Sequence, residues 1–196
     1  MFTGIIETLG KLVKLEKEGS NIHFTVESPI SDQLKVDQSV AHNGVCLTVV
    51  QVGNGWHTVT AIDETLKRTN LGQLEVGNEV NLERCMLANG RFDGHIVQGH
   101  VDQLGEVLSI QTQYGSHVIS FKHTEGDNFT VDKGSITVNG VSLTAFDTSN
   151  SGFSVAIIPY TFEHTTFKNL KVGDKVNLEF DIVGKYVARM LAKQKP

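Results

Sequence analysis

The chain repeats itself with a period close to half its length, and this repeat constrains the fold more than any other feature. The decapeptide SVAHNGVCLT returns 96 positions later as SITVNGVSLT, and three further blocks recur in the same order. A repeat of this length indicates a duplicated domain rather than a solenoid, whose units are shorter and more numerous. The matched blocks are residues 39–48 and 135–144, 64–69 and 160–165, and 74–83 and 170–179 at an offset of 96, and residues 4–10 and 99–105 at an offset of 95.

Each half has the pattern of a small β-barrel. Residues 23–26 and 117–121 alternate between polar and apolar, residues 57–62 and 153–158 are β-branched and apolar, and Asn-Gly pairs at 43–44 and 139–140 indicate tight turns. Barrel closure leaves no exposed strand edge. We therefore predict an all-β fold of two tandem six-stranded Greek-key β-barrels related by internal duplication, in residues 1–96 and 97–183, followed by a C-terminal α-helix in residues 184–196.

Apolar residues near the C-terminus recur at helical spacing. Such a stripe needs a covering surface, and two interpretations are open: the helix packs on the second barrel of its own chain, or it joins subunits. The stripe consists of Ile182, Val183, Tyr186, Val187, Met190 and Leu191.

Charge and composition exclude several classes of protein. The 17 basic and 22 acidic residues form no basic stripe, so nucleic acid is a poor candidate partner. No segment has the roughly 20 apolar residues of a membrane-spanning helix, and Met1 leads directly into a strand-like segment. Cys46 and Cys85 lie in apolar runs and suit reduced thiols in a cytoplasmic protein. His95 and His100 are five positions apart, which would put them on opposite faces of a strand, so we predict no metal site.

Four motifs in this order resemble the riboflavin synthase family. They are MFTGI at residues 1–5, the paired NGVCLT and NGVSLT blocks, GHIVQGH at residues 94–100 and IPYT at residues 158–161, and the resemblance spans the whole chain. It implies a transferase that moves a four-carbon unit between two molecules of 6,7-dimethyl-8-ribityllumazine. The products are riboflavin and 5-amino-6-ribitylaminouracil, this is the last step of riboflavin biosynthesis, and no cofactor is implied.

The resemblance also implies an assembly. Members of the family are expected to form homotrimers through their C-terminal helices, with the productive site between the first barrel of one subunit and the second barrel of another. An association with lumazine synthase is left open.

Two other functions compete with the enzyme. A non-catalytic lumazine or flavin carrier, such as an antenna protein, would bind without turnover. The intact Ser142-Leu143-Thr144 and His100 favour the enzyme, because these positions are degraded in such relatives. An oligonucleotide-binding barrel is disfavoured by the acidic balance and by the lack of interleaved basic and aromatic residues.

Duplication suits a reaction between two copies of one molecule, which needs two similar pockets. Holding two reactants in the right geometry can contribute about 7–11 kcal/mol to catalysis. Matched positions that differ between the halves are where the two pockets would take different roles. These pairs are Ile5 and His100, Asp37 and Lys133, Cys46 and Ser142, Asp63 and Pro159, Glu64 and Tyr160, and Cys85 and Asp181.

Six residues are candidates for the chemistry, and several have a plainer structural interpretation. His100 follows Gly99 and suits proton transfer near neutral pH, or is a hydrogen-bonded structural histidine. Cys46 is a pocket thiol or an inert buried one, and Asp181 is catalytic or an N-cap of the terminal helix. The hydroxyl groups of Ser39, Ser142 and Thr144 suit ligand binding or the holding of a reactive water, although such residues are often strand or turn formers. The other histidines, His42, His57, His117, His123 and His164, are expected to be ordinary surface or packing residues.

The resemblance places further residues around the ligands. Lys133 would reach a ligand across a subunit boundary, or is a solvated turn residue before Gly134. Tyr160 stands where the family often has Glu or His, which puts the ribityl contacts of the second barrel in doubt. The implied binding residues are Gly4, Ile5, Ile6, Cys46, Leu47, Thr48, Thr60, Ala61, Ile62, Asp63, Glu64, Thr65, Gly99, His100, Val101, Lys133, Ser142, Leu143, Thr144, Ile158, Pro159, Tyr160, Thr161, Phe162 and Glu163.

Overall fold

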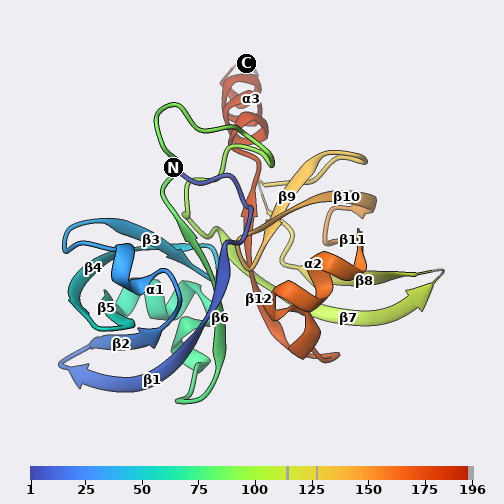
Figure 1. The fold of residues 1–196 in the computed structure, drawn as a ribbon. Helices are drawn as coiled ribbons and strands as arrows, with labels where there is room; N and C mark the ends of the chain where they lie inside the picture. Colours follow the sequence, from blue (N-terminus) through green and yellow to red (C-terminus); the bar gives the residue numbers. More distant parts are fainter. Residues whose placement is uncertain (114, 127, 194–196) are drawn as a thin grey trace.

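Two closed antiparallel barrels of six strands stand side by side in the computed structural model, which describes residues 1–113, 115–126 and 128–193 (Figure 1). The first barrel contains β1 (Thr8–Glu18), β2 (Asn21–Glu27), η1 (Ser31–Gln33), β3 (Ser39–His42), β4 (Val45–Gly53), β5 (Trp56–Ala61), α1 (Asp63–Arg68), η2 (Asn70–Gln73) and β6 (Glu79–Arg84). The second contains β7 (Gln103–Gln113), β8 (Ser116–His123), β9 (Ser135–Val138), β10 (Val141–Ser149), β11 (Gly152–Ile157), α2 (Pro159–His164), η3 (Thr166–Asn169) and β12 (Lys175–Phe180). The helix α3 (Ile182–Ala192) follows.

The two barrels have the same strand order, which confirms the predicted fold class. Around the first barrel the order is β1-β2-β5-β4-β3-β6, and around the second it is β7-β8-β11-β10-β9-β12. In each, a hairpin is followed by a three-strand meander whose last strand returns to pair with the hairpin, as in a Greek key. The strands β1 and β7 start 95 positions apart, and β3 and β9 start 96 apart. The one-residue gap in the repeat therefore lies between β8 and β9.

Alternating side chains fill the two cores. Val40, Val59 and Leu82 are fully buried in the first barrel, and Ile136, Val155 and Leu178 occupy the matched positions in the second. Because successive residues of a strand point to opposite faces, the intervening residues lie on the outside of each barrel. Ser39, Ala41 and Cys46 belong to this outer face in the first barrel, and Thr137 and Ser142 belong to it in the second.

The predicted Asn-Gly turns bring the two barrels together. Asn43 and Asn139 both have φ of 47°, and the glycines that follow have φ of 78° and 82°, as a type I′ turn requires. A Cβ on Gly44 would lie 2.6 Å from the backbone nitrogen of Gly140, so only glycine allows this approach. The turns therefore close two hairpins and also form the contact between the halves.

A cluster of buried asparagines joins the barrels across this contact. Asn81 Nδ2 donates to the carbonyl of Asn139 at 2.8 Å, and Asn177 Nδ2 donates to the carbonyl of Asn43 at 2.8 Å. Asn177 Nδ2 also donates to Asn70 Oδ1 at 2.9 Å. Because these bonds satisfy buried polar groups of both halves, they fix the barrels relative to each other.

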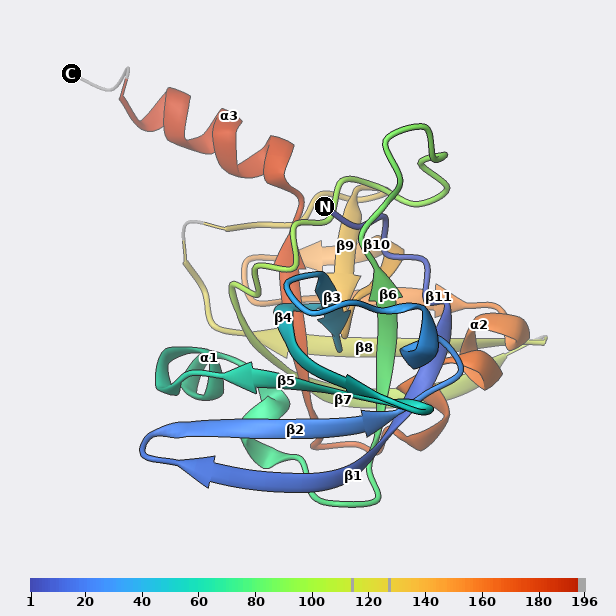
Figure 2. The same cartoon turned by 60° about the vertical axis from the view of Figure 1, so that its left-hand side comes forward.

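Helix α3 begins at Ile182, two residues before the predicted segment, and residues 194–196 of that segment lie outside the described residues. Asp181 caps it by accepting from the backbone N–H of Val183 at 2.9 Å. The helix extends away from both barrels (Figure 2), and its apolar side chains are exposed: Tyr186 by 68% and Met190 by 64%. The second barrel of the same chain therefore does not cover the stripe. Across the described residues, no helix has the length and apolar character to cross a membrane.

Candidate functional site

Each barrel is preceded by a short segment that packs on the other barrel. We call residues 2–6 the first lead segment and residues 97–101 the second lead segment. They pair with each other, since Phe2 and Val97 exchange backbone hydrogen bonds of 2.8 and 3.1 Å. The first lead segment then crosses to Ser142 of the second barrel, whose N–H donates to the carbonyl of Gly4 at 2.8 Å. Figure 1 shows this segment running between the barrels before it enters β1.

The second lead segment makes the reciprocal contact with the first barrel. The N–H of Cys46 donates to the carbonyl of Gly99 at 2.9 Å. Val101 packs against the first core, and Ile6 of the first lead segment packs against the second core. Gly4 and Gly99 both have φ of 79°, and a Cβ on either would lie 2.6 Å from the Cβ of Ser142 or Cys46. His100 therefore belongs with the first barrel and Ile5 with the second.

A buried glutamate anchors each lead segment. Glu83 accepts from the N–H groups of Thr3 and Gly4 at 2.7 and 3.0 Å. Glu179 accepts from the N–H groups of Gln98, Gly99 and His100 at 2.7, 2.9 and 3.0 Å. Burial raises the pKa of both carboxyl groups, and these N–H donors oppose the rise by favouring the ionised form. The backbone that leads into His100 is thus fixed.

The second-barrel site is a cavity of about 400 Å³. Its walls come from the first lead segment, from Val141 and Ser142 at the start of β10, and from α2 and the residues after it. The implied binding residues that line it are Gly4, Ile5, Ile6, Ser142, Tyr160, Thr161 and Glu163, and the additional lining residues are Glu7, Thr8, Leu9, Val141, His164, Thr165 and Lys168.

His95, which the sequence did not single out for a role, contacts the lining residue Ser142 without lining the cavity itself. Its Nδ1 lies 2.6 Å from Ser142 Oγ, and its Nε2 lies 3.1 Å from Thr137 Oγ1. Burial lowers the pKa of His95, and the nearby carboxylate of Asp181 opposes that shift. A neutral imidazole between two hydroxyl groups has one donor and one acceptor nitrogen, so it can pass a proton to or from Ser142.

The first barrel places different chemical groups on the matched surface. Cys46 stands at the position of Ser142, and Ala41 stands at the position of Thr137. Burial raises the pKa of the Cys46 thiol, although a hydrogen bond with Ser39 opposes that change. Cys46 is therefore held in its thiol form, which makes it a hydrogen-bonding group rather than a ready nucleophile. In the second lead segment, Cys46 contacts Gly99, the residue before His100.

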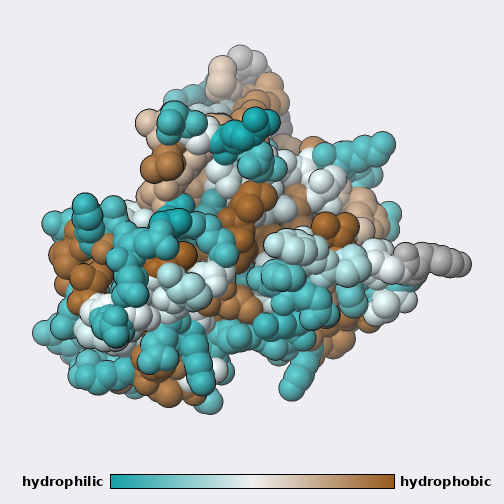
Figure 3. All heavy atoms as spheres, viewed as in Figure 1, coloured by the Kyte–Doolittle hydropathy of each residue, from teal (hydrophilic) through white to brown (hydrophobic). Residues whose placement is uncertain are grey.

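Ser39 lies on a further cavity, of about 740 Å³, together with Glu83 and Arg84. This cavity and the second-barrel site share Ile5 and Glu7. The first lead segment thus forms a common wall between the two hollows. Figure 3 shows apolar residues at the surface in this junction between the barrels.

The remaining implied residues lie in the barrel cores, at the starts of α1 and α2, or on the solvent-exposed surface. Thr60 accepts or donates a 2.8 Å bond with His23 Nδ1, and Asp63 and Glu64 pair with Lys67 and Arg68 one turn along α1. Leu47 is in the first core, Leu143 and Phe162 pack against the second, and Phe162 stacks on His117. Ala61 is buried, whereas Ile62, Ile158 and Pro159 are exposed at the starts of α1 and α2. Thr48 and Thr144 face solvent beside Ser39 and Ser135, and Thr65 accepts at its carbonyl from the Thr69 hydroxyl.

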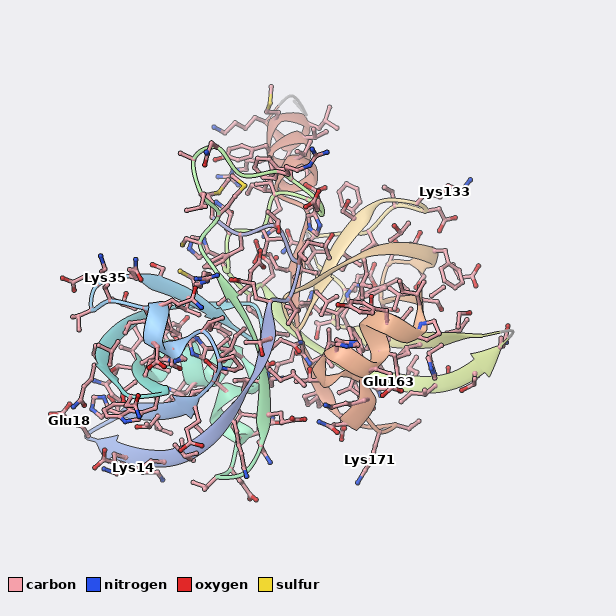
Figure 4. The ribbon with its side chains drawn as sticks, in the orientation of Figure 1. Lys14, Glu18, Lys35, Lys133, Glu163 and Lys171 are labelled. Carbon is pink, nitrogen blue, oxygen red and sulfur yellow. The ribbon has the colours of Figure 1, made fainter. Side chains whose placement is uncertain are left out.

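Lys133 does not line either of the two cavities described above. It is exposed, has φ of 64°, and points away from the tip of the second barrel, whereas Glu163 lies along α2 (Figure 4). Asp181 caps α3, as described above. In residues 1–113, 115–126 and 128–193, no three His, Cys, Asp or Glu side chains gather as metal ligands do.

Comparison with known proteins matches the two halves separately and the chain as a whole. A family described as "Lumazine binding domain" matches residues 3–85 and again residues 98–181. Riboflavin synthase of Actinobacillus pleuropneumoniae is 43% identical over 99% of this chain and 91% of its own length. Riboflavin synthase of Bacillus subtilis (strain 168) is 42% identical over 98% of this chain and 91% of its own.

Solved structures show the same arrangement of two barrels. A crystal structure of LumP complexed with riboflavin is 25% identical, with a TM-score of 0.83 over 92% of this chain and 99% of that one. LumP complexed with 6,7-dimethyl-8-(1'-D-ribityl) lumazine is 24% identical, with a TM-score of 0.83 over 91% of this chain and 98% of that one.

Proposed function

The chain belongs to the riboflavin synthase family, and from that premise we propose that it converts two molecules of 6,7-dimethyl-8-ribityllumazine into riboflavin and 5-amino-6-ribitylaminouracil. The observation that carries the proposal is the duplicated site with unequal chemistry. Both halves have a barrel surface, an exchanged lead segment and a buried glutamate. Yet the surface of the first barrel has Cys46 with His100 from the second lead segment, where the surface of the second barrel has Ser142 with Ile5 from the first lead segment.

The reaction needs two like pockets because its two substrates are the same molecule. It needs different groups in them because one molecule gives up the four-carbon unit and the other accepts it. Removal of a proton from the 7-methyl group of one molecule gives an anion delocalised through its ring system. That step requires a base, or a water held by one, and the partner molecule requires a nucleophile or an activated water at C7.

On the surface of the first barrel, where the second lead segment contacts Cys46, we assign proton transfer to His100 and ligand binding to Cys46 and Ser39. The three N–H bonds to Glu179 hold the backbone that presents His100. The raised pKa of Cys46 keeps a thiol hydrogen available as a donor. Fixed donors and acceptors stabilise developing charge better than mobile water does.

In the second-barrel site we assign the corresponding role to Ser142, assisted by His95. The 2.6 Å contact between Ser142 Oγ and His95 Nδ1 supports a hydroxyl group that holds a water or a ring atom while the imidazole takes or returns the proton. Backbone groups of Gly4 and Ile5 would face the ligand from the other wall of the cavity. Thr144 and the capping Asp181 are assigned supporting contacts, the latter through its charge on His95.

A turnover assay tests this proposal directly. The purified protein is incubated with 6,7-dimethyl-8-ribityllumazine, and riboflavin is followed by absorbance and identified by chromatography. We expect riboflavin and the pyrimidine product in equal amounts. Tight lumazine binding without riboflavin would instead establish a carrier. His100→Gln is expected to lower turnover more than it weakens binding, and unchanged turnover would remove His100 from the mechanism.

We further propose that three chains assemble through α3, so that the first barrel of one chain faces the second barrel of another. The exposed stripe of α3 supports this, because it is left uncovered within the chain. Lys133, which points away from its own barrel, would then reach a neighbouring site, and the assembly would work in the cytoplasm, with docking to lumazine synthase left to a binding experiment. Removal of residues 184–196 should give monomers that bind lumazine with little turnover. A fully active monomer would refute a site shared between chains.

A further inference from the structure

Lys185 is the charged side chain of α3 that turns back toward the barrel. Its side chain is 20% exposed, and its Nζ lies 2.6 Å from Oδ2 of Asp102, whose side chain is 18% exposed. By contrast, Arg189 and Lys193 on later turns are exposed. A pair with both members mostly shielded from solvent is screened much less than a surface pair.

The partner of Lys185 lies two residues beyond His100. Oδ2 of Asp102 also accepts from the N–H of Phe180 at 2.9 Å, and the N–H of Asp102 donates to the carbonyl of Leu178 at 2.9 Å. The segment from Gln98 to Asp102 is therefore fixed at one end by Glu179 and at the other by Asp102. The charge of Lys185 also reaches Glu179, where it opposes the rise in pKa that burial causes.

In the first half, the matching carboxylate pairs with a cation of its own barrel rather than with a cation of a helix. Glu7, at the position of Asp102, accepts from the N–H of Arg84 at 2.7 Å and pairs with the guanidinium of that same residue. Arg84 lies on β6, so the first lead segment is held by its own barrel. At the matched position of β12 the chain has Phe180, and the cation comes from α3 instead. The first barrel forms its carboxylate–cation pair without a helix, whereas the second barrel takes the cation from α3. The Lys185–Asp102 pair therefore couples α3 to the second lead segment.

We infer that Lys185 is a positioning residue that ties the orientation of α3 to the segment presenting His100. The inference rests on the proposed function, in which His100 transfers a proton. Through the Lys185–Asp102 pair, a displacement of α3 moves the backbone that carries the imidazole. Turnover therefore depends on how α3 is docked, separately from whether the apolar stripe holds chains together.

The test compares four variants with the wild-type protein: Lys185→Met, Lys185→Arg, Asp102→Asn and, as a control at the C-cap of the same helix, Lys193→Met. Because small misplacements of a reacting group are costly, we expect Lys185→Met and Asp102→Asn to lower kcat about tenfold or more. KM should change by less than about twofold, because the binding surface is intact. Lys185→Arg should recover most of the activity, and Lys193→Met should behave as the wild type.

Two further measurements separate positioning from assembly and stability. The double variant Lys185→Met/Asp102→Asn should be no slower than either single variant, because residues of one pair are not additive. Size-exclusion chromatography should show the wild-type assembly for every variant. Unchanged kcat in Lys185→Met, a loss explained wholly by KM or by dissociation, or failure of Lys185→Arg to recover activity would each overturn the inference. Absence of turnover in the wild-type protein would refute the proposed function instead.

Discussion

Replacing His42 by Val and His57 by Phe should remove an acid-sensitive element from the first core. Both histidines are buried, and Val138 and Phe153 occupy the matched positions of the second barrel. A single chain of hydrogen bonds satisfies the pair. Because the Val40 carbonyl only accepts, His42 Nδ1 donates to it at 3.2 Å, so His57 Nε2 donates to His42 Nε2 at 2.9 Å and His57 Nδ1 accepts from Ser31 Oγ at 2.8 Å.

The hydrogen-bond partners of this buried pair include no carboxylate that would stabilise an added proton. Burial and the neighbouring histidine lower the pKa of His42 to about 3, and burial lowers the pKa of His57 to about 4. In the unfolded chain both would have an ordinary value of about 6.5. The unfolded state therefore binds more protons as pH falls below neutrality, and stability is lost from there down to the folded pKa values. At pH 5 each histidine costs about 1.36 × 1.5, or about 2 kcal/mol, which gives about 4 kcal/mol for the pair.

Urea denaturation at pH 7.5 and pH 5.0 measures this difference. The wild-type protein should lose about 4 kcal/mol more than the His42→Val/His57→Phe variant between the two values. Buried Glu83 and Glu179 titrate in both proteins, so their contribution cancels in the comparison. His164→Phe, at an exposed histidine, is the control and should follow the wild type. An equal pH dependence in the double variant and the wild type would refute the reasoning.

Three further changes test the site and the junction. Cys46→Ser introduces the hydroxyl group that the second barrel has at this position, so it should keep lumazine binding within about threefold while lowering turnover several-fold in the absorbance assay. Cys85→Ser, at an exposed thiol, is the control and should leave both binding and turnover unchanged. His95→Leu removes the partner of Ser142 and should lower kcat about tenfold or more, with His95→Gln less severe; equal kcat in all three proteins would contradict the assigned role. Asn177→Leu leaves buried groups of Asn43 and Asn70 unpaired and should destabilise by about 3 kcal/mol in urea, whereas Asn150→Ala at the surface should change stability by less than about 0.5 kcal/mol.

The repeat predicted the fold because both halves must obey the same strand alternation. The offset of 95 at residues 4–10 and 96 at residues 39–48 even requires the extra residue that the structure has between β8 and β9. The positive φ of Asn43 and Asn139 was predictable as well, because a two-residue hairpin turn needs it. Asp181 was a candidate N-cap from the sequence and does cap α3, whereas the predicted segment boundary at residue 184 lies two residues after the start of the helix.

The sequence did not reveal which barrel each lead segment serves. The match of Gly4 with Gly99 shows that the two segments are equivalent, but equivalence is kept whether each covers its own barrel or the other. His95 was missed because the offset of 95 would place its counterpart before Met1, so no contrast between halves marks it. His42 and His57 were expected to be ordinary, because strand alternation does not distinguish a buried histidine pair from two separate surface residues.

The reciprocal crossing of the two lead segments has a consequence for the origin of the gene. A single barrel would hold its own lead segment only through its buried glutamate, because the strand that Gly4 or Gly99 contacts belongs to the other copy. Its Asn-Gly turn would likewise lack the partner turn that it meets in the duplicated chain. A second copy supplies both contacts. We therefore expect a single barrel with its lead segment to pair with a second copy of itself, so that duplication would have joined two such partners in one chain. Residues 1–96 expressed alone should form such a dimer in light scattering, and a stable monomer would speak against this history.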